Sequence, residues 1–282
     1  MTRGKKMTKK ILLINDIPGY GKVAVSAMTP VLIRKGFEVY NLPTAILSNT
    51  LNYGKFASLD TTEYMREAVA VWKELGFKFD TVATGFISNG KQCEFIADFV
   101  KEEAEKGAVI YADPIMGDNG KLYNSVTKDR VDIMKRIITN TDYIVPNITE
   151  ACILSGIPYN EKGFTKNELN KIVETLHEMG AKSVVITSAT KLNDDGQSAK
   201  TVVGYDGKKE EYFSVEYEEI PVKINGSGDI FSAVIISETM SGNNLETSVR
   251  KAVSVLRQMI LENKDIIHEY NGLPVEANLD LF

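Results

Sequence analysis

The stretch Val109-Ile110-Tyr111-Ala112-Asp113-Pro114-Ile115-Met116-Gly117-Asp118 decides the fold. Its first four residues are apolar or aromatic, which is typical of a short buried strand. The turn that follows contains two carboxylates, a proline and a glycine, which are common turn residues. A short apolar strand that ends in a polar turn is typical of a parallel sheet covered on both faces.

On either side of this stretch, predicted helices alternate with predicted strands. A strand at 81–86 and a helix at 94–106 precede it, and a helix at 131–138 and a strand at 143–145 follow. The same alternation predicts further strands at 11–14, 39–47 and 184–187, and further helices at 23–33, 61–75, 166–179, 229–240 and 245–261. Between 200 and 217, two strand-like runs flank Asp206-Gly207, which indicates a β-hairpin.

This order predicts an α/β fold: a three-layer α/β/α arrangement with a mostly parallel sheet and an antiparallel hairpin at one edge. No Pro/Gly/Ser-rich linker and no internal repeat interrupts the chain, so we expect one domain over residues 1–282. Residues 1–8 contain several basic side chains and no apolar pattern, and we expect them to form a flexible tail.

Composition excludes several classes of function. The chain has 282 residues, with 33 Lys and Arg against 38 Asp and Glu, so its formal charge is −5. This balance gives no electrostatic attraction for nucleic acid or for an anionic membrane. Two cysteines form no disulfide framework or zinc motif. With no signal-peptide pattern and no apolar run of membrane-spanning length, we expect a cytoplasmic protein.

The segment Asn225-Gly226-Ser227-Gly228-Asp229 opens an apolar helix. Glycines allow a ligand to approach the backbone, and the free N–H groups at a helix N-terminus attract anions. Asp229 would lie beside such an anion, where it could accept a proton from an attacking hydroxyl. The same residues are also typical of an ordinary helix N-cap, so this motif alone leaves both interpretations open.

Three other strand ends carry polar residues. Asp113 and Asp118 follow one strand, and carboxylates are suitable ligands for Mg²⁺, although a plain turn would contain the same residues. Asn147 and Glu150 follow the next strand, where they could hold magnesium-bound water or cap a helix. Thr187-Ser188 could bind phosphates or be ordinary strand-end residues. Because ligands of open parallel sheets bind at the carboxyl ends of strands, we expect the site there.

The loop Asn15-Asp16-Ile17-Pro18-Gly19-Tyr20-Gly21 after the first strand is a candidate ligand-contacting loop. It lacks the third glycine of the dinucleotide fingerprint, and the chain contains no G-x-x-x-x-G-K-[ST] phosphate loop. A second polar loop, Ser48-Asn49-Thr50-Leu51-Asn52-Tyr53, follows the second strand.

Taken in order, these segments resemble the ribokinase-like superfamily, and specifically its pyridoxal/pyridoxamine kinase branch. The resemblance covers most of the chain, from Ile11 to the helix after Asp229, and is carried by seven segments: Gly19-Tyr20-Gly21, Leu47-Ser48-Asn49, Thr84-Gly85-Phe86, Asp113 to Asp118, Pro146-Asn147-Ile148-Thr149-Glu150-Ala151, Val184 to Ser188, and Gly226-Ser227-Gly228-Asp229. It implies ATP-dependent phosphorylation of the hydroxymethyl group of a vitamin B6 compound.

The resemblance also implies roles for individual residues. Asp229 would be the general base, and the backbone amides of Gly226, Ser227 and Gly228 would form the anion hole. Asp113 and Glu150 would organise Mg²⁺, while ATP would contact Asp118, Asn147, Thr187 and Ser188. The pyridine pocket would be lined by Asp16, Tyr20, Ser48 and Phe86. Members of the branch are usually homodimers, and a monovalent cation such as K⁺ is often an activator.

Two departures from the family pattern stand out. Ser227 replaces the usual Thr and keeps its hydroxyl, whereas Thr50-Leu51-Asn52 replaces a usual His-Thr-Gly, so that Leu51 takes the place of a hydroxyl near the substrate. Two alternatives therefore stay open at this point: hydroxymethylpyrimidine kinase on the same fold, and a non-catalytic B6 or nucleotide binder. A sugar or nucleoside kinase would need extra strands forming a lid, for which the chain has little room.

Overall fold

A computed structural model describes residues 8–123, 126–193, 196–222, 224–266 and 271–282. Most of the tail predicted at 1–8 lies outside this part of the chain. The helices are α1 (Ala24–Arg34), α2 (Thr62–Glu74), α3 (Gly90–Glu105), α4 (Lys128–Ile138), α5 (Ile148–Ser155), α6 (Lys166–Glu178), α7 (Ser227–Met240) and α8 (Leu245–Asn263), with 3₁₀ segments η1 (Leu51–Tyr53) and η2 (Val275–Leu281).

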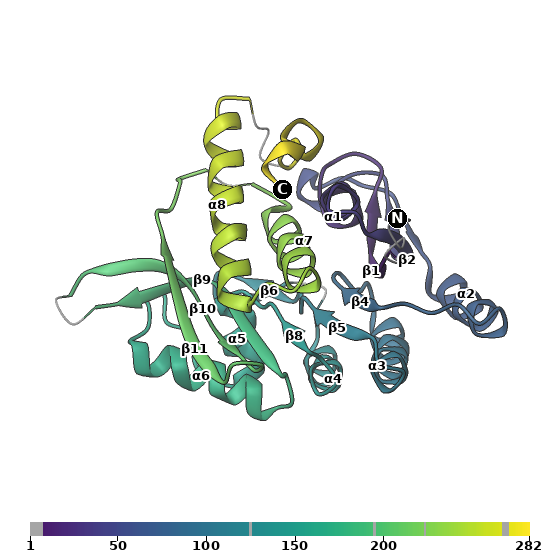
Figure 1. Ribbon diagram of the computed structural model, residues 1–282, viewed down its shortest axis with the longest axis horizontal. Helices are drawn as coiled ribbons and strands as arrows, with labels where there is room; N and C mark the ends of the chain where they lie inside the picture. The colour runs from purple at the N-terminus through teal and green to yellow at the C-terminus, as the bar shows by residue number, and fades with distance from the viewer. Residues whose placement is uncertain (1–7, 124–125, 194–195, 223, 267–270) are drawn as a thin grey trace, which may run out of the picture.

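The strands form one long sheet and one short hairpin. They are β1 (Lys10–Pro18), β2 (Glu38–Leu47), β3 (Ser58–Asp60), β4 (Thr81–Thr84), β5 (Val109–Ala112), β6 (Gly117–Asp118), β7 (Lys121–Leu122), β8 (Tyr143–Ile144), β9 (Ser183–Leu192), β10 (Ser198–Asp206) and β11 (Glu211–Tyr217). The long sheet has the order β11-β10-β9-β8-β5-β4-β1-β2-β3, and β6 pairs with β7 (Figure 1).

The centre of the long sheet is parallel from β2 to β9. Both edges are antiparallel: β10 and β11 extend it beyond β9, and β3 pairs with β2. The predicted α/β/α fold with an edge hairpin is therefore confirmed, while β3 was not predicted. The strand order reverses between β1 and its two neighbours, β4 and β2, which is where open α/β sheets bind ligands.

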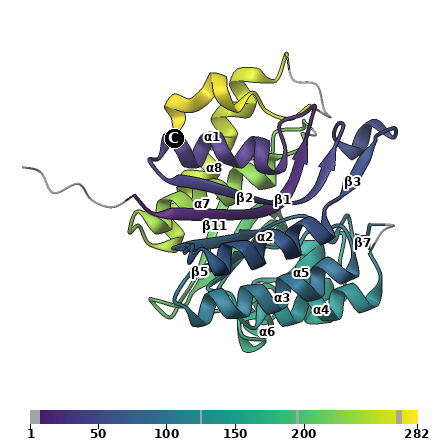
Figure 2. The same ribbon diagram turned by 90° about the vertical axis from the view of Figure 1, so that its right-hand side faces the viewer.

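Helices cover both faces of the sheet. Figure 2 shows α1 and α8, with the C-terminal segment, above the strands, and α3 to α6 below them. Alternate residues of β1 enter the two cores: Leu12 and Ile14 pack on the α2–α6 side, and Ile11 and Leu13 on the α1, α7 and α8 side. This period of two explains why the predicted strand is a continuous apolar run in the sequence.

Some predicted bounds differ from the structure. The helix expected at 94–106 begins at Gly90, because the Asn89 side chain accepts the Gln92 N–H and caps it four residues earlier. The strand expected at 81–86 ends at Thr84. Within the described residues, no helix is long and apolar enough to cross a membrane.

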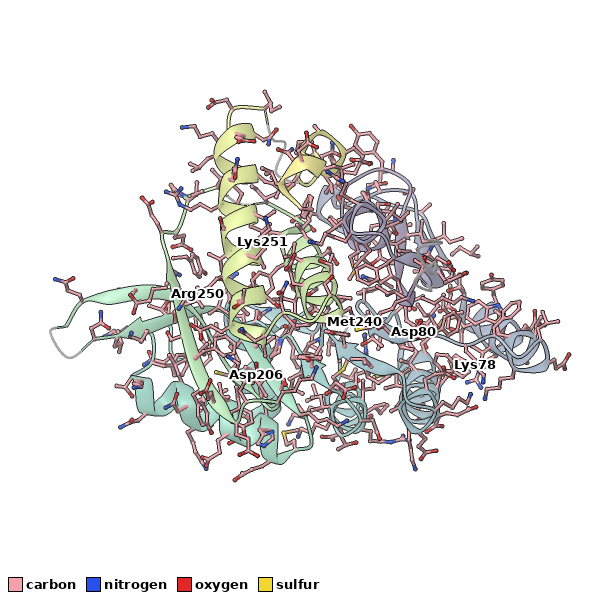
Figure 3. The ribbon with its side chains drawn as sticks, viewed as in Figure 1. Lys78, Asp80, Asp206, Met240, Arg250 and Lys251 are labelled. Atoms are coloured by element: carbon pink, nitrogen blue, oxygen red, sulfur yellow. The ribbon has the colours of Figure 1, made fainter. Side chains whose placement is uncertain are left out.

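The hairpin is fixed to the helical layer at the sheet edge opposite the candidate loops. Asp206, at the end of β10, is buried, and its Oδ2 accepts the N–H of Leu245 at the start of α8, 3.1 Å away (Figure 3). This contact satisfies one of the free donors of the helix N-terminus. The antiparallel edge is therefore tied to α8, which lines the large cavity described below.

Candidate active site

The first turn of α7 is shaped by two glycines with different surroundings. Gly226 adopts φ +78°, a left-handed conformation that favours glycine, and an added Cβ would lie 2.4 Å from the carbonyl oxygen of Lys22. At Gly228 an added Cβ would meet no protein atom within 4 Å. Gly226 therefore allows close packing against the segment before α1, whereas Gly228 leaves open space beside the N–H groups of the helix start.

The segment before α1 is held by the C-terminal part of the chain. The N–H of Lys22 donates to the carbonyl of Asn271 over 2.6 Å, and the side chain of Lys22 pairs with Glu276 in η2. Gly272, at φ +82°, packs with its Cα against the Lys22 carbonyl. Residues far apart in the sequence thus fix the position of the α1 start.

Asp229 lies where the N-termini of α1 and α7 meet. Its carboxylate accepts the backbone N–H of Ala24, a residue held at φ +49°, and the Nδ2 of Asn15 lies 3.5 Å from its Oδ1. Such a φ is uncommon for alanine and is found mainly where surrounding structure imposes it. Burial raises the pKa of Asp229 to about 6, while the two hydrogen bonds act in the opposite direction.

Asp113 follows β5, and its side chain faces the first turns of α7, near Asp229. Its Oδ2 accepts the hydroxyl of Ser232, one turn along α7 from Asp229, over 3.2 Å. Burial raises the pKa of Asp113 well above its usual range, and the charges of Glu150 and Asp229 raise it further. The structure therefore brings the carboxylates of Asp113, Glu150 and Asp229 within electrostatic reach of one another.

Asn147 and Glu150 form a capping box at the start of α5. The Asn147 side chain accepts the Glu150 N–H, and Glu150 Oε2 accepts the Asn147 N–H over 2.9 Å. The other oxygen, Oε1, accepts the N–H of Met116 over 2.9 Å. Since Asn147 Nδ2 also donates to the Gly117 carbonyl, both side chains bind the 113–118 turn.

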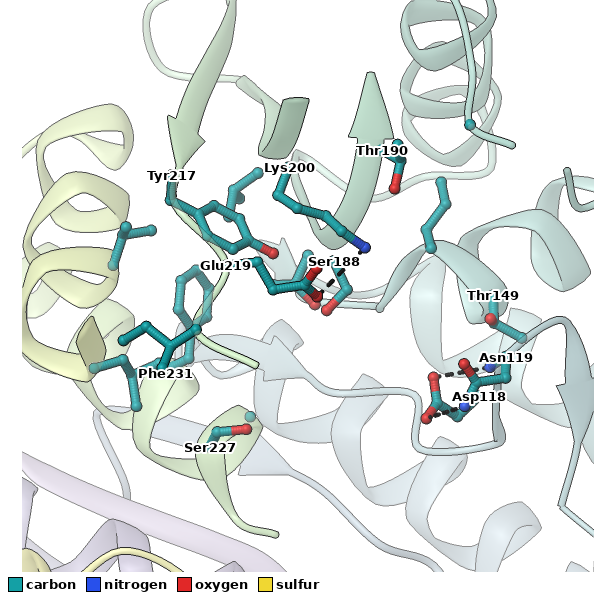
Figure 4. A pocket seen from close by; sticks show the side chains of 18 of the residues that line it. Asp118, Asn119, Thr149, Ser188, Thr190, Lys200, Tyr217, Glu219, Ser227 and Phe231 are labelled. Carbon is teal, nitrogen blue, oxygen red and sulfur yellow. Dashed lines mark hydrogen bonds and ion pairs between the residues drawn. The ribbon is translucent and has the colours of Figure 1, made fainter. Parts of the chain in front are cut away.

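A cavity of about 1010 Å³ opens beside these groups, between the hairpin edge and α8 (Figure 4). Its polar wall contains Asp118, Thr187, Ser188, Ser227 and Gly228, and its apolar wall is formed by the side chains of Val222, Ile224, Phe231, Val253, Leu256 and Ile260. One wall suits phosphates and the other suits a flat heterocycle, and the volume is that of a cofactor-sized pocket.

The residues expected to contact ATP lie differently around this cavity. Ser188 is exposed and adopts φ +58°, and it hydrogen-bonds the hydroxyl of Tyr217. Asp118 is also exposed, but both of its carboxylate oxygens accept hydrogen bonds from Asn119. Asn147, also expected to contact ATP, is not among the residues that line the cavity.

The residues expected to surround a pyridine ring lie at the ends of β1, β2 and β4. Asp16 is buried, and burial together with the charge of Asp229 raises its pKa to about 7. The Phe86 carbonyl accepts the Thr44 hydroxyl over 2.7 Å. The Ser48 hydroxyl is used within its own turn, since it donates to Asn49 and accepts the Ala57 N–H.

The two loops at this end form one unit. The N–H of Gly19 donates to the Leu47 carbonyl over 2.7 Å, and the N–H of Thr50 donates to the Tyr20 carbonyl over 3.1 Å. The exposed ring of Tyr20 packs edge-on against Tyr53, with centroids 6.3 Å apart. The exposed ring of Tyr20 therefore packs on the neighbouring loop, on the surface of the molecule.

Sequence reasoning missed several residues of the site. Lys200, Tyr217 and Glu219 line the large cavity from the hairpin edge, with a Lys200–Glu219 ion pair of 3.4 Å across it (Figure 4). Leu256 and Ile260 resemble ordinary core residues of an amphipathic helix, so no sequence signal separates them. The contact between Asn15 and Asp229 spans 214 positions and only folding brings it together.

Magnesium was predicted from Asp113 and Glu150. Within the described residues, no group of three or more His, Cys, Asp or Glu side chains could hold a metal ion. Mg²⁺ sites of kinases usually need only one or two carboxylates, because nucleotide phosphates and water complete the shell. Asp113 fits this role because its carboxylate lies beside two others, and Glu150, whose oxygens each accept a backbone N–H, keeps further lone pairs that could bind magnesium-bound water.

A parallel sheet with open helix N–H groups and buried carboxylates at its carboxyl edge is the arrangement of a ribokinase-like small-molecule kinase. The model of the phosphomethylpyrimidine kinase family matches residues 34–274. The chain belongs to this family, within its pyridoxal kinase branch.

Individual relatives support this placement. Human pyridoxal kinase is 28% identical over 89% of this chain and 84% of its own length. A Bacteroides thetaiotaomicron protein, assigned provisionally to the phosphomethylpyrimidine kinases and crystallised with pyridoxal, superimposes with a TM-score of 0.90 at 33% identity, over 98% of this chain and 96% of that one. Leishmania donovani pyridoxal kinase with ADP and pyridoxine gives 0.80 at 25% identity, over 96% and 94%.

Proposed function

We propose that the chain transfers the γ-phosphoryl group of ATP to the 5′-hydroxymethyl group of pyridoxal, pyridoxamine or pyridoxine. One observation carries this proposal: the start of α7, with its open N–H groups, lines a nucleotide-sized cavity, and the carboxylates of Asp229 and Asp113 lie close together beside the first turns of the same helix. The relatives named pyridoxal kinase, and the complexes with pyridoxal and with ADP, support both substrates.

Asp229 would act as the general base. The N–H of Ala24 and the amide of Asn15 orient its carboxylate, and a pKa of about 6 leaves it mostly ionised at neutral pH. A base with a pKa near the working pH is both available and strong enough to accept a proton from the hydroxymethyl oxygen as the O–P bond forms. Phosphoryl transfer depends mainly on such positioning and on charge stabilisation.

The backbone N–H groups of Gly226, Ser227 and Gly228 would stabilise the charge of the moving phosphoryl group. They lie at the N-terminus of the 14-residue helix α7, where the free donors carry partial positive charge. Such fixed donors need no reorganisation during the reaction. A bound Mg²⁺ would supply further neutralisation of phosphate charge, with Asp113 as its protein ligand.

On the nucleotide side, Thr187 and Ser188 would contact phosphates and the apolar wall on α8 would hold the base. On the substrate side, Asp16 and Phe86 would contact the pyridine ring. Hydroxymethylpyrimidine kinase, the close alternative, is not favoured, because the curated relatives are pyridoxal kinases. A non-catalytic binder is disfavoured because Asp113 and Asp229 are both present and lie close to each other.

We further propose that the chain acts as one kinase unit and forms a homodimer in the cytoplasm. An apolar surface supports the dimer: Tyr64, Val71 and Leu75 are exposed on one face of α2, and Ile46 and Leu59 are exposed on the neighbouring strands β2 and β3. Exposed apolar residues that gather over adjacent elements are typical of a contact with another chain.

The experiment is an ADP-release assay across pyridoxal, pyridoxamine, pyridoxine and hydroxymethylpyrimidine. We expect the highest kcat/KM with a B6 vitamer, dependence on Mg²⁺, and at least a ~10²-fold loss of kcat in Asp229→Asn with unchanged ATP affinity. A preference for hydroxymethylpyrimidine would favour hydroxymethylpyrimidine kinase. ADP release that does not increase with any hydroxymethyl substrate would reject the kinase proposal. Near-normal turnover of Asp229→Asn would remove Asp229 as the base.

A further inference from the structure

Asn15 lies inside the molecule near the end of β1, with 1% of its surface exposed. Its Oδ1 accepts two backbone N–H groups, from Asp16 at 3.0 Å and from Phe86 at 2.8 Å. Only the oxygen of an amide side chain can accept these bonds. The two donors therefore fix which way the amide points, and the NH₂ group must face the opposite direction.

That opposite direction is the carboxylate of Asp229. Asn15 Nδ2 lies 3.5 Å from Asp229 Oδ1, and its other near partner is the sulfur of Met28 at 3.8 Å. The space around these groups is small: a cavity of about 10 Å³, with Asn15, Thr84, Asp113, Asp229 and Ser232 among its lining. One water molecule at most fits such a volume, so the amide is the nearest donor on this side of the Asp229 carboxylate.

Gly85 shows that the fold reserves space for this amide. An added Cβ at Gly85 would lie 2.4 Å from Asn15 Nδ2 and 2.7 Å from Asn15 Oδ1. Since real Cβ atoms do not approach that closely, the amide could not keep its place beside any larger residue at position 85. The backbone directly after β4 therefore passes against the side chain of Asn15.

We propose that Asn15 is a positioning residue, which joins the wall of the substrate pocket to the catalytic base. One half of its amide holds the backbone at Phe86, and the other half orients Asp229. Asn15 acts through Asp229 and does not touch the reacting atoms. This inference rests on the proposed function, because Asp229 must be the base for its orientation to affect turnover.

The test uses a substitution that separates the two halves of the amide. Asn15→Asp keeps the size of the side chain and an oxygen that accepts the N–H groups of Asp16 and Phe86, and in its ionised form it offers no donor to Asp229. Because burial beside Asp229 raises the pKa of such a carboxyl, kcat is measured up to pH 9, where the new side chain loses its proton. We expect kcat to fall at least tenfold with KM for ATP within twofold of wild type. Asn15→Ala should lose the same turnover and also lower the melting temperature.

Gln92 provides a matched control. It is another fully buried amide near Phe86, whose Nε2 donates to the Thr44 carbonyl over 2.7 Å and whose Oε1 accepts the Ser88 N–H. Gln92→Glu makes the same chemical change without a contact to Asp229. We expect it to lower the melting temperature while the folded enzyme keeps its kcat; equal kcat losses in Gln92→Glu and Asn15→Asp would overturn the proposal.

A second measurement separates this inference from the proposed function. Titration of the Asp229 carboxyl by ¹³C NMR in the free protein needs no substrate, and Asp16 and Asp113 are the other carboxylates that face it. We expect the pKa of Asp229 to rise in Asn15→Ala, because a donor to the ionised form is lost. An unchanged pKa would overturn the role of Asn15 even if the wild type phosphorylated no B6 vitamer.

Discussion

At the scale of single residues, the two glycines beside Asp229 lack a side chain for different reasons. Gly226 needs its conformation and its contact with the Lys22 carbonyl, so the protein itself excludes a side chain there. Gly228 is crowded by no protein atom, so its lack of a side chain has no structural reason in the free protein. A phosphoryl group beside the N–H groups of α7 would supply that reason.

This contrast gives a paired prediction. Gly228→Ala should fold as well as wild type, or gain about 0.5–1 kcal/mol because alanine favours a helix, while kcat falls at least tenfold. Gly226→Ala should lower both the melting temperature and kcat, because the new Cβ would push away the segment that carries Ala24. Thermal unfolding and steady-state kinetics measure both effects; a Gly228→Ala enzyme with normal kcat would argue against an anion hole at that position.

At the scale of elements, much of the fold could be predicted from the sequence. Continuous apolar runs such as Val184 to Ile186 and the Asp206-Gly207 turn give strong local signals for strands and a hairpin. Short elements gave none: β3, β6 and β7 contain two or three residues each, which is too few for a periodic pattern to appear. The start of α3 was missed because Gly90 follows the capping Asn89.

The candidate site, like the fold, has features that the sequence predicts and features that it does not. The position of Asp113 directly after β5 could be predicted, whereas Ser188, expected after a strand, lies within β9, which continues to Leu192. Asp229 lies in the first turn of α7, as predicted. What each side chain binds could not be found, because it depends on residues far away in the sequence. Glu150 illustrates this: its second oxygen binds Met116, 34 positions away, which no local pattern reveals.

The loops 19–21 and 48–53 are the elements that should control substrate binding. Gly21 adopts φ +126°, and an added Cβ would lie 2.4 Å from Thr50 Cγ2, so Gly21→Ala should separate the two loops. We expect KM for the B6 substrate to rise about tenfold, roughly 1.4 kcal/mol, with KM for ATP unchanged. Initial-rate kinetics with each substrate varied in turn would measure this.

Gly54 supplies the control for this prediction. It also has a positive φ, +73°, and follows η1 in the same region, but an added Cβ would meet no atom within 4 Å. Gly54→Ala therefore introduces similar backbone strain without separating the loops. If both variants raised KM for the B6 substrate equally, strain rather than the contact between the loops would be responsible.

At the scale of the whole molecule, the site lowers the stability of the free protein at neutral pH. Burial raises the pKa of Asp16 and Glu150 to about 7 and of Asp229 to about 6, all above their ordinary values. The folded state thus binds protons more tightly than the unfolded state between about pH 4 and 7. The contribution of these carboxyls to the free energy of unfolding is therefore greatest near pH 4. It is lost as the pH rises through the pKa values that they have in the folded state.

We accordingly expect the free protein to melt at a higher temperature at pH 5.5 than at pH 8. Each pKa unit corresponds to about 1.4 kcal/mol, so Asp229→Asn should stabilise the protein at pH 8 by ~1–3 kcal/mol and much less at pH 4. Four other carboxylates have lowered pKa values, and they change the stability only at pH values below this range: Asp60, Glu102, Glu168 and Glu276. A melting temperature that rises from pH 5.5 to pH 8 would contradict this account.

The contact between Lys22 and residues 271–276 has a consequence for folding during synthesis of the protein. Strands β1 to β9 and the start of α7 leave the ribosome before Asn271, Gly272 and Glu276 exist. Until those residues emerge, the segment that presents the Ala24 N–H to Asp229 lacks its support. A nascent chain can therefore assemble most of its sheet while the support of its catalytic base is still missing, and we expect turnover only after residues 271–276 have emerged.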